Sequence, residues 1–437
     1  MSLQPQANNN GGRPVYIVDG ARTPFIKARG KPGPFTPVDL AVQAGRPLLL
    51  RQPVAAEHFD RVILGCVNVI AAEMNPARIA ALRLGLGETM PAFTMQINCG
   101  SGMQSIETAF RYIREGNDDL ILAGGAEALS HAPLILQDEA TNWLAELGQA
   151  RSIPAKLKHL MKLKPAYFKP EISLKKGLTD PVVELNMGQT AEVVANLFNI
   201  SRQEADEYAV RSHLRLAEAQ KAGWLDNEVV PMVADDGSVY SFDDGVRPDS
   251  SVEHLAKLKP VFERPYGKVT AGNSSQITDG ASWVILASEE AVNKYNLKPK
   301  AVIRDSEWSG LEPEIMGLGP AVSAGRLALR NQLSLDDIDL LELNEAFAAQ
   351  VLGCLAAWND KDFCQSIFGI DHVLGEFDQE RLNIDGGAVS LGHPVGTSGN
   401  RIVLHLVNAL ERKGLKRGIA TQCIGGGQAG AMLIEML

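Results

Sequence analysis

The sequence predicts an α/β fold made of two similar halves. Short runs of β-branched residues alternate with amphipathic helical segments, the runs end in glycine-rich turns, and this rhythm returns in the second half of the 437 residues. Hydrophobic residues form 45% of the chain and charged residues 22%, which suffices for one large core or two. We therefore expect two domains or a duplicated one.

The first half alternates predicted strands and helices. Residues 13–25 open with a β-branched run that breaks at Gly20, and residues 59–70 predict a second, buried strand. Residues 92–98 predict a third strand, which leads into a helix because apolar residues recur after Cys99 at helical spacing until Gly116. Residues 119–130 predict the next strand. Strands that alternate with helices in this way predict a parallel sheet.

The second half repeats this order. Residues 337–347 predict a strand like the one at 59–70, residues 382–414 predict a strand, a glycine-rich turn and a helix, and residues 418–437 predict a strand, a turn and a strand. In each half a polar reactive residue stands between a strand end and a helix start, which internal duplication would explain. Residues 261–281 are loop-like and rich in small residues, which suits close approach of a ligand to the backbone.

Charge and cysteine content exclude several classes of protein. The formal net charge of −10 argues against general nucleic-acid binding, which needs a basic face. Residues 1–12 are polar and predict a disordered tail, and we find no run of about 20 apolar residues for a membrane helix. The five cysteines are odd in number and lack a C-x-x-C spacing, so neither a disulfide framework nor a metal site is predicted. Reduced thiols fit a cytoplasmic location.

A basic insertion lies between the halves. Residues 151–176 carry eight Lys or Arg and one acid, Glu171, in an acidic protein. A charge run of this kind forms either a solvated helical face or a docking surface. Because Leu157, Leu160 and Met161 share a helical side, a surface helix that docks an anionic ligand, a lipid surface or a partner subunit is the second possibility.

Two residues could form a nucleophile and its base. Cys99 in "QINCGSGMQ" stands at what reads as the first turn of a helix, where the helix dipole and free N–H groups would favour its thiolate. A buried, inert cysteine is the other interpretation. His393 lies in a tight glycine-rich loop before a helix and could accept the cysteine's proton, and an imidazole with only structural contacts is the other interpretation.

Two further residues complete a candidate set. Cys423 in "TQCIGGGQAG" is a second thiol at a strand end, and a thiol can transfer protons as well as attack carbon. Asn344 in "ELNEAFAAQ" could hold a water or donate to an oxyanion, or it could simply cap the next helix. Ligands bind at the carboxyl ends of parallel strands, so we expect the four residues to meet there. Two thiols, an imidazole and an amide suit Claisen chemistry on thioesters, with one thiol carrying an acyl group.

Four motifs, in this order, resemble those of the thiolases: "NCGSGMQS", "NEAFAAQ", "GGAVSLGHPVGTSG" and "CIGGGQAGAML". The segments "RTPF", "GGAEALS", "MGQTAE" and "VTAGNSSQITDGA" fit between them, and the resemblance covers about residues 13–437. It implies the thiolase fold, in which two similar βαβαβαββ halves form a five-layered α/β/α/β/α sandwich with an inserted loop domain. The implied boundaries are 13–132 for the N-terminal half, completed by about 258–292, then 133–257 for the loop domain and 293–437 for the C-terminal half.

The same resemblance implies roles for site residues. Cys99 would carry the acyl group, His393 would activate it, and Cys423 would be the acid and base at the α-carbon. Asn344, through a water, and His393 would stabilise one thioester oxyanion, and the N–H groups of Cys99 and Gly425 the other. The implied substrate-binding residues are Met187, Gly272, Ser275 and Phe347.

The implied activity is thiolysis of 3-ketoacyl-CoA in fatty-acid β-oxidation, with CoA as a substrate and no bound cofactor or metal. The basic insertion and Lys257, Lys259, Arg264 and Lys268 would supply positive charge for CoA. A homodimer or tetramer, a hydratase/dehydrogenase partner subunit and peripheral membrane contact through 151–176 are further expectations.

Other readings stay open at this point. The insertion makes the chain most similar to thiolase subunits of β-oxidation complexes, yet it has Asn344 where members of that subgroup often have histidine, which leaves the acyl-chain length open. Alternatives are a biosynthetic acetyl-CoA acetyltransferase, a decarboxylating or HMG-type condensing enzyme, a noncatalytic acyl-CoA-binding subunit, and a Cys-His hydrolase. The second thiol, Cys423, argues against the condensing enzymes and the hydrolase.

Overall fold

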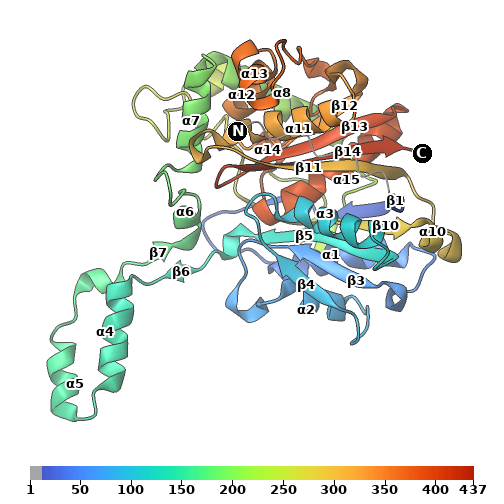
Figure 1. The fold of residues 1–437 in the computed structure, drawn as a ribbon. Helices are drawn as coiled ribbons and strands as arrows, with labels where there is room; N and C mark the ends of the chain where they lie inside the picture. The colour runs from blue at the N-terminus through green and yellow to red at the C-terminus, as the bar shows by residue number, and fades with distance from the viewer. Residues whose placement is uncertain (1–11) are drawn as a thin grey trace.

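The computed structural model describes residues 12–437 and contains one large sheet in two parts (Figure 1). All of the predicted tail except Gly12 therefore lies outside the described residues. The N-terminal part has the order β4-β3-β5-β10-β1 and the C-terminal part the order β11-β14-β13-β12, and antiparallel pairing of β1 with β11 joins them. The strands are β1 (Val15–Arg22), β3 (Arg61–Gly65), β4 (Ala92–Met95), β5 (Leu120–Ala128), β10 (Thr278–Ser288), β11 (Ala301–Gly310), β12 (Leu340–Leu343), β13 (Arg417–Ile424) and β14 (Gln428–Met436), with the short β2 (Ile26–Lys27) paired to β10.

The two parts share one topology. Each part contains four strands that, numbered in chain order, lie side by side as first, fourth, third and second: β1-β10-β5-β3 in one part and β11-β14-β13-β12 in the other. Strand β4 adds an edge strand to the N-terminal part. β3 is parallel to β5 and β12 to β13, whereas the remaining neighbours in these sets are antiparallel. The prediction of two similar halves is confirmed. The prediction of a parallel sheet is wrong, because the last strand of each half inserts between two earlier strands and is antiparallel to both. These strands are β10, between β1 and β5, and β14, between β11 and β13.

Five layers result from this arrangement. Helices α3 (Ser101–Arg114) and α15 (Val395–Lys413) pack against each other and against strands of both parts, so they form the central layer. Helices α1 (Pro37–Leu50) and α2 (Pro76–Arg83) cover the outer face of the N-terminal part. Helix α11 (Gly319–Arg330) covers the outer face of the C-terminal part, and α12 (Ala348–Trp358) packs against α11. Separate buried apolar clusters fill the three helical layers, as the α/β/α/β/α prediction requires.

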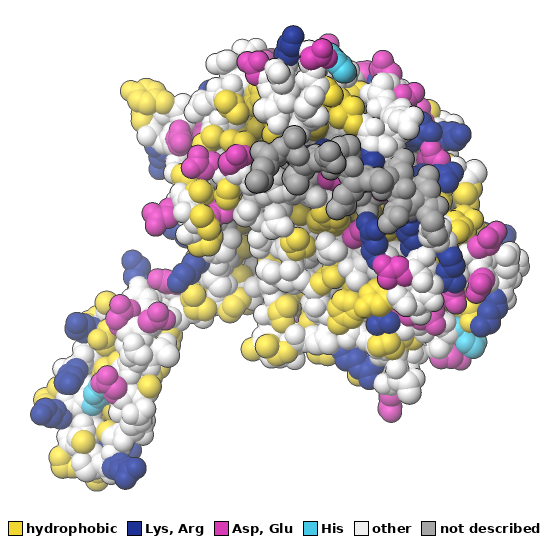
Figure 2. Space-filling view, in the orientation of Figure 1, with side chains coloured by type: hydrophobic (Ala, Val, Ile, Leu, Met, Phe, Trp, Pro, Cys, Tyr) yellow, Lys and Arg dark blue, Asp and Glu magenta, His cyan; other side chains and the backbone are white. Residues whose placement is uncertain are grey.

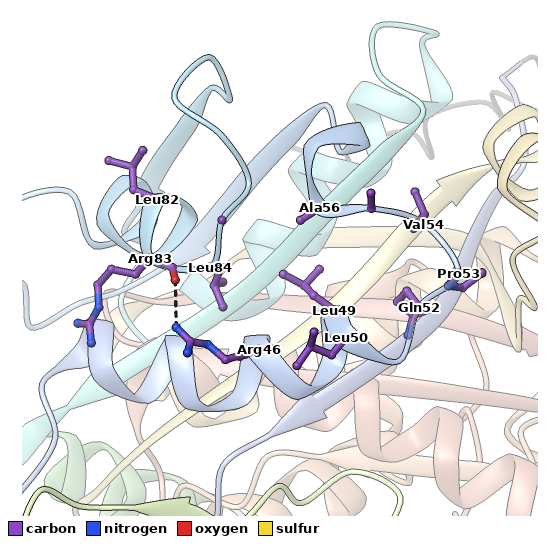
Figure 3. A pocket seen from close by; sticks show the side chains of 12 residues that line it. Arg46, Leu49, Leu50, Gln52, Pro53, Val54, Ala56, Leu82, Arg83 and Leu84 are labelled. Atoms are coloured by element: carbon purple, nitrogen blue, oxygen red, sulfur yellow. Dashed lines mark hydrogen bonds between the residues drawn. The ribbon is translucent and has the colours of Figure 1, made fainter.

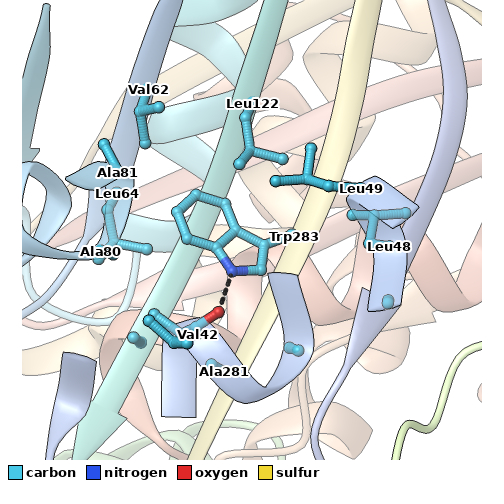
Figure 4. Close-up of a cluster of buried hydrophobic side chains, with 14 of the residues drawn as sticks. Val42, Leu48, Leu49, Val62, Leu64, Ala80, Ala81, Leu122, Ala281 and Trp283 are labelled. Atoms are coloured by element: carbon cyan, nitrogen blue, oxygen red, sulfur yellow. Dashed lines mark hydrogen bonds between the residues drawn. The ribbon is translucent and has the colours of Figure 1, made fainter. Parts of the chain in front are cut away.

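Trp283 shows how tightly the first outer layer packs. Its indole is fully buried between β10 and α1, among Leu48, Leu64 and Leu122 (Figure 4). The indole Nε1 donates a hydrogen bond of 2.8 Å to the carbonyl oxygen of Ala41. A large aromatic side chain can be buried without cost to its polar atom when that atom finds such a partner.

Residues 134–172, which include most of the basic insertion, form an arm that projects from the body (Figure 1). Strands β6 (Leu134–Ile135) and β7 (Glu171–Ile172) pair as an antiparallel stalk, and helices α4 (Asp138–Gln149) and α5 (Ile153–Leu160) form a hairpin at its end. Stacking of the Trp143 and His159 rings, 5.6 Å apart, holds the two helices together. The lysines of the arm therefore lie at the surface, away from the body of the chain.

After the arm, the chain returns through α6 (Ser173–Gly177) and covers the C-terminal part. The remaining elements are α7 (Met187–Leu197), α8 (Arg202–Lys221), β8 (Met232–Val233), β9 (Val239–Tyr240), α9 (Val252–Leu255), α10 (Glu289–Tyr295), α13 (Lys361–Phe368) and α14 (Ala388–Leu391). The strand predicted at the start of 382–414 is wrong: Leu382 makes only an isolated bridge to Leu341 before α14. Within residues 12–437, no helix has the length and apolar character needed to cross a bilayer.

A buried ionic network ties α15 to the first strand. Arg22 donates to Glu228 at 2.8 Å, and Glu228 lies 3.0 Å from Nδ1 of His405. Burial by itself would lower the pKa of His405, but the carboxylates of Glu228, Glu342 and Asp385 raise it to about 10. The imidazolium is therefore the charged link between the central helix and these carboxylates at neutral pH.

Candidate active site

Cys99 lies in a tight turn between β4 and α3. Asn98 has a positive φ of 45°, and the hydroxyl of Ser101 accepts from the Ile97 N–H at 2.9 Å and donates to the Asn98 carbonyl at 2.7 Å. Helix α3 begins at Ser101 with Gly100 as its N-cap, so Cys99 precedes the first turn instead of belonging to it. The turn presents the thiol next to the helix N-terminus.

The predicted lowering of the Cys99 pKa is wrong. Burial raises the pKa of this thiol to about 11, although the backbone N–H groups of Gly425 and of Cys99 itself act in the opposite direction. Desolvation outweighs the N–H groups, because a thiolate loses its hydration in a covered site. Cys99 is therefore a thiol at neutral pH and needs a base that takes its proton during reaction.

Cys423 and Gly425 lie directly against Cys99. The Asn98 side chain donates to the Gly425 carbonyl at 2.9 Å, and the pKa of the buried Cys423 thiol is raised well above its usual value, by burial and then by the nearby Cys99. A Cβ placed on Gly100 would collide with Ile424. The structure thus brings the two sulfurs and the Gly425 N–H to one site, on which the proposed bond-breaking chemistry depends.

His393 lies in the loop between α14 and α15, not at a strand end as expected. The backbone N–H of His393 donates to the Gln276 carbonyl at 2.9 Å, and the ring Nδ1 lies 2.6 Å from the hydroxyl oxygen of Ser398. Because that hydroxyl also donates to the Pro394 carbonyl, it can accept from Nδ1–H and leave Nε2 as the ring's acceptor.

The other ring nitrogen of His393 is open to a reaction partner. Nε2 is buried and makes no hydrogen bond to any described residue. Burial, with a smaller contribution from Arg401, lowers the pKa of His393 to about 4. A neutral imidazole at neutral pH can accept the proton of a thiol.

Asn344 directly follows β12 and is fully buried. Its N–H donates to the Thr421 carbonyl at 3.0 Å, two residues before Cys423, and neither atom of its side-chain amide has a hydrogen-bond partner within residues 12–437. It does not cap α12, because Phe347 holds that N-cap position. A buried amide without a protein partner is suited to a water or a substrate oxygen.

The N-termini of the two central helices bring these residues together. A Cβ on Gly102 of α3 would lie 2.9 Å from the Gly396 carbonyl of α15, and one on Gly399 would lie 2.6 Å from the Met103 nitrogen. Glycine is required at both positions because the backbones approach so closely. This contact sets the loop of His393 beside the turn of Cys99.

Three of the predicted substrate-binding residues border the same region. A Cβ on Gly425 would lie 3.4 Å from the sulfur of Met187, and the Ser275 N–H donates to the Ala346 carbonyl at 2.9 Å. Phe347 packs edge-on against Phe262 at 6.1 Å.

Gly272 packs somewhat further along the same loop. It lies against Leu255 and Leu258, since a Cβ there would be 2.6 Å from each side chain. The loop of Lys257, Lys259, Arg264 and Lys268 is therefore near these residues. The arm projects from the body (Figure 1), and the expected contribution of residues 151–176 to CoA binding stays a prediction.

Two surface hollows lie away from this region. One of about 530 Å³ is lined by the end of α1 and by residues 53–56 and 82–85, with Arg46 donating to the Arg83 carbonyl at 3.2 Å (Figure 3). The other, of about 950 Å³, lies beside Asp19, Arg51 and Glu411. None of the predicted site residues lines either hollow. The candidate active site is therefore identified by its reactive side chains and not by the volume of a surface hollow.

Sequence reasoning missed three residues that hold the site. Gln276 and Ser398 fix the His393 loop, and Glu127 of β5 accepts a hydrogen bond from the Gly396 N–H at 2.9 Å. The signal for Glu127 was present, because an acid inside the apolar run "LILAGGAEA" must be buried with partners.

Comparison with known families now decides the assignment. Residues 15–290 match the family model described as thiolase, N-terminal domain, and residues 297–436 match thiolase, C-terminal domain. The chain belongs to the thiolase family. It is an acyltransferase of that family, and the sequence-based recognition is confirmed.

Similar thiolases include degradative and biosynthetic proteins. The chain is 38% identical over 429 residues to the mitochondrial 3-ketoacyl-CoA thiolase of Bos taurus, covering 97% of this chain and 98% of the relative. It is 37% identical over 426 residues to the acetyl-CoA acetyltransferase of Chromobacterium violaceum, covering 96% and 99%. It is 36% identical over 424 residues to the mitochondrial trifunctional enzyme subunit beta of Bos taurus, covering 97% and 88%.

Solved thiolase structures share the fold. The crystal structure of human mitochondrial 3-ketoacyl-CoA thiolase in complex with CoA is 36% identical, with a TM-score of 0.83, and the match covers 97% of this chain and 98% of that one. The crystal structure of the Bacillus anthracis acetyl-CoA acetyltransferase is 35% identical at the same TM-score, covering 98% and 100%. The predicted thiolase fold is confirmed.

Proposed function

We propose that this thiolase cleaves 3-ketoacyl-CoA with CoA, giving acetyl-CoA and a shortened acyl-CoA, in fatty-acid β-oxidation. The observation that carries the proposal is the shared site of Cys99, Cys423 and the Gly425 N–H, beside the loop of His393. Two thiols allow one sulfur to hold an acyl group while the other moves a proton at carbon.

In the first half-reaction, Nε2 of His393 takes the proton of Cys99, and the sulfur attacks the 3-keto carbonyl. The imidazolium and Asn344, through a water, donate to the oxyanion that forms. The bond between the α and β carbons breaks, the acyl group remains on Cys99, and Cys423 gives its proton to the departing enolate of acetyl-CoA. The N–H groups of Cys99 and Gly425 stabilise the enolate oxygen.

In the second half-reaction, Cys423 takes the proton of an incoming CoA thiol. The CoA sulfur attacks the thioester carbonyl on Cys99, and Cys99 leaves with the proton held by His393. Both thiols and the imidazole return to their starting protonation states. The raised pKa of both thiols fits this cycle, because both sulfurs are protonated in the resting enzyme and the Cys423 thiolate left by the first half-reaction is a strong enough base to take the proton of CoA.

The alternative is the reverse direction, condensation of two acetyl-CoA to acetoacetyl-CoA. Asn344 and the relative named acetyl-CoA acetyltransferase favour it. A noncatalytic acyl-CoA-binding subunit is less well supported, because the nucleophile, base and second thiol are all in place.

A comparison of substrates tests the proposed function. We expect the purified protein to thiolyse a long-chain 3-ketoacyl-CoA with a kcat/KM at least about tenfold above that for acetoacetyl-CoA. Loss of the 3-ketoacyl-CoA absorbance with added CoA measures both rates. A preference for acetoacetyl-CoA would favour the biosynthetic alternative, and no turnover of either substrate would contradict both.

We also propose that the arm makes peripheral contact with an anionic membrane surface. Helix α5 and its C-cap expose Ile153 at 75% and Met161 at 80%, and Leu157 is also exposed. Lys156, Lys158 and Lys162 alternate with these apolar residues along the sequence, and dark blue side chains line the arm (Figure 2). Exposed apolar residues among lysines suit an interface of acyl chains and anionic headgroups.

Replacing Lys158, Lys162 and Lys164 by glutamine should weaken binding to anionic phospholipid vesicles by about 100-fold, because each lysine near such a surface contributes about 1 kcal/mol. Vesicle sedimentation measures the change, and thiolysis kinetics should stay unchanged because the arm lies away from the site. The same substitution at Lys221, Lys294 and Lys361 of the body is the matched control. Equal binding of both triple variants would exclude the arm, and a raised KM for CoA in the arm variant would assign its lysines to substrate binding.

The remaining proposals concern organisation. We propose the division into halves and loop domain given by the sequence, a homodimer or tetramer, and a cytoplasmic location, which the five free cysteines support. Several relatives are named mitochondrial, so cell fractionation decides the compartment. The relatives named trifunctional enzyme subunit beta support a hydratase/dehydrogenase partner subunit.

A further inference from the structure

Glu127 is a buried carboxylate that holds backbone from two separate loops. Its Oε2 accepts from the Val67 N–H at 3.0 Å and from the Gly396 N–H at 2.9 Å, and its Oε1 accepts from the Asn68 N–H at 2.8 Å. The side chain is fully buried, and no Lys or Arg pairs with it within residues 12–437. Its charge is held by N–H groups, including one in the first turn of α15, where the helix dipole favours an anion.

Both loops belong to the surroundings of the catalytic groups. Val67 and Asn68 follow β3 and Cys66, and Gly396 is the third residue after His393. The fit is close: a Cβ on Gly396 would lie 2.7 Å from Glu127 Oε2 and 3.0 Å from the Cα of Cys66. The carboxylate therefore stands between the loop after β3 and the start of α15, with little room for either to shift.

We propose that Glu127 is a positioning residue for the thiolase reaction, whose carboxylate clamps the His393 loop to the loop after β3 and so fixes Nε2 of His393 relative to Cys99. This inference rests on the proposed function. The physical reason is that an imidazole accepts a proton efficiently only when it is held at hydrogen-bond distance from the thiol. Three hydrogen bonds to one charged group hold a loop more firmly than neutral pairs would.

The clamp depends on the charge of Glu127. Burial raises the pKa of this carboxyl to about 7 against the lowering effect of the three N–H groups, and Asp279 of β10 raises it further. The other titratable groups that feel its charge are Cys66 after β3 and Cys99 before α3. Protonation as the pH falls through this range removes an acceptor from one of the N–H groups and loosens the clamp.

Glu127→Gln tests the inference, because glutamine keeps the size and shape of the side chain but removes its charge. Its NH₂ group is a donor, so it cannot accept from the backbone N–H group that it faces. We expect kcat for thiolysis to fall by about 10 to 100-fold at about pH 8, with the KM for CoA changed less than about twofold. The acidic limb of the kcat profile, expected near the pKa of Glu127, should disappear. Glu127→Asp keeps the charge but is shorter, so it should lower kcat and retain the acidic limb.

Asp60→Asn is the control, since the Asp60 carboxylate accepts from the Asp119 and Leu120 N–H groups at the other end of β5. It should change neither kcat nor the pH profile. A Glu127→Gln enzyme with wild-type kcat and an unchanged acidic limb would overturn the inference, as would a loss confined to thermal stability. If Glu127→Gln does not fold, an unchanged kcat in Glu127→Asp overturns it instead. Absence of thiolysis by the wild-type enzyme would refute the proposed function, whereas an active wild type with an unaffected Glu127→Gln refutes only the clamp.

Discussion

Replacing Cys99 by alanine should lower kcat for CoA-dependent cleavage of a 3-ketoacyl-CoA by at least about 1,000-fold, because no other sulfur can form the acyl thioester. Cys423 lies next to Cys99 but is fully buried, and burial raises the pKa of its thiol well above the usual value, so we do not expect it to replace Cys99 as the nucleophile. The measurement is single-turnover thiolysis, together with mass spectrometry for an acyl group on the protein.

The matched control for this substitution is Cys364→Ala. Cys364 is a free thiol too, and it is buried with its sulfur against the carbonyl oxygens of Ala357 and Trp358 in the outer layer. We expect that variant to keep wild-type turnover and the Cys99 variant to keep the wild-type circular dichroism spectrum. Retained turnover in folded Cys99→Ala would disprove the assignment of the nucleophile.

Replacing Cys423 by serine should separate the two chemical steps. Transfer of an acyl group from acyl-CoA to Cys99 should persist, because the nucleophile and His393 are untouched. Carbon–carbon cleavage should fall by about 10² to 10⁴-fold, since a serine hydroxyl is a much weaker acid than the thiol that protonates the departing enolate. Mass spectrometry of acylated Cys99 and loss of the 3-ketoacyl-CoA absorbance measure the two steps separately.

Cys354→Ser is the control for the second thiol. Cys354 is a neighbouring buried thiol whose sulfur donates to the Gly317 carbonyl at 3.2 Å, so its replacement makes the same chemical change without touching the proposed proton transfer. Equal losses of acyl transfer and cleavage in Cys423→Ser would indicate a general disturbance of the site instead of a role in one step.

The sequence indicated candidate side chains that the structure brings together, because each stands where the local sequence is unusual. A thiol beside glycines, as at Cys99 and Cys423, interrupts an apolar strand pattern that can be recognised without any tertiary information. The strand and helix rhythm likewise predicted two similar halves, because buried strands and amphipathic helices carry strong periodic signals.

Features that depend on distant residues could not be predicted in this way. The pKa of Cys99 is raised by burial at a place where Gly425, more than three hundred residues along the chain, packs against the turn of Cys99, so a local helix argument gave the wrong direction. The mixed sheet arises from where the last strand of each half inserts, which periodicity does not encode. The composition of residues 151–176 predicted positive charge and a helix. It did not predict that paired strands β6 and β7 would hold this helix away from the body.

The position of β14 also has a consequence for how the enzyme is made. This strand lies between β11 and β13, yet it is synthesised after both, so the C-terminal sheet stays open at its middle until β14 inserts. The turn that connects β13 to β14 contains Gly425, whose N–H faces the Cys99 sulfur. A nascent chain therefore contains Cys99 long before Gly425 can reach it, and insertion of β14 during folding completes the candidate site.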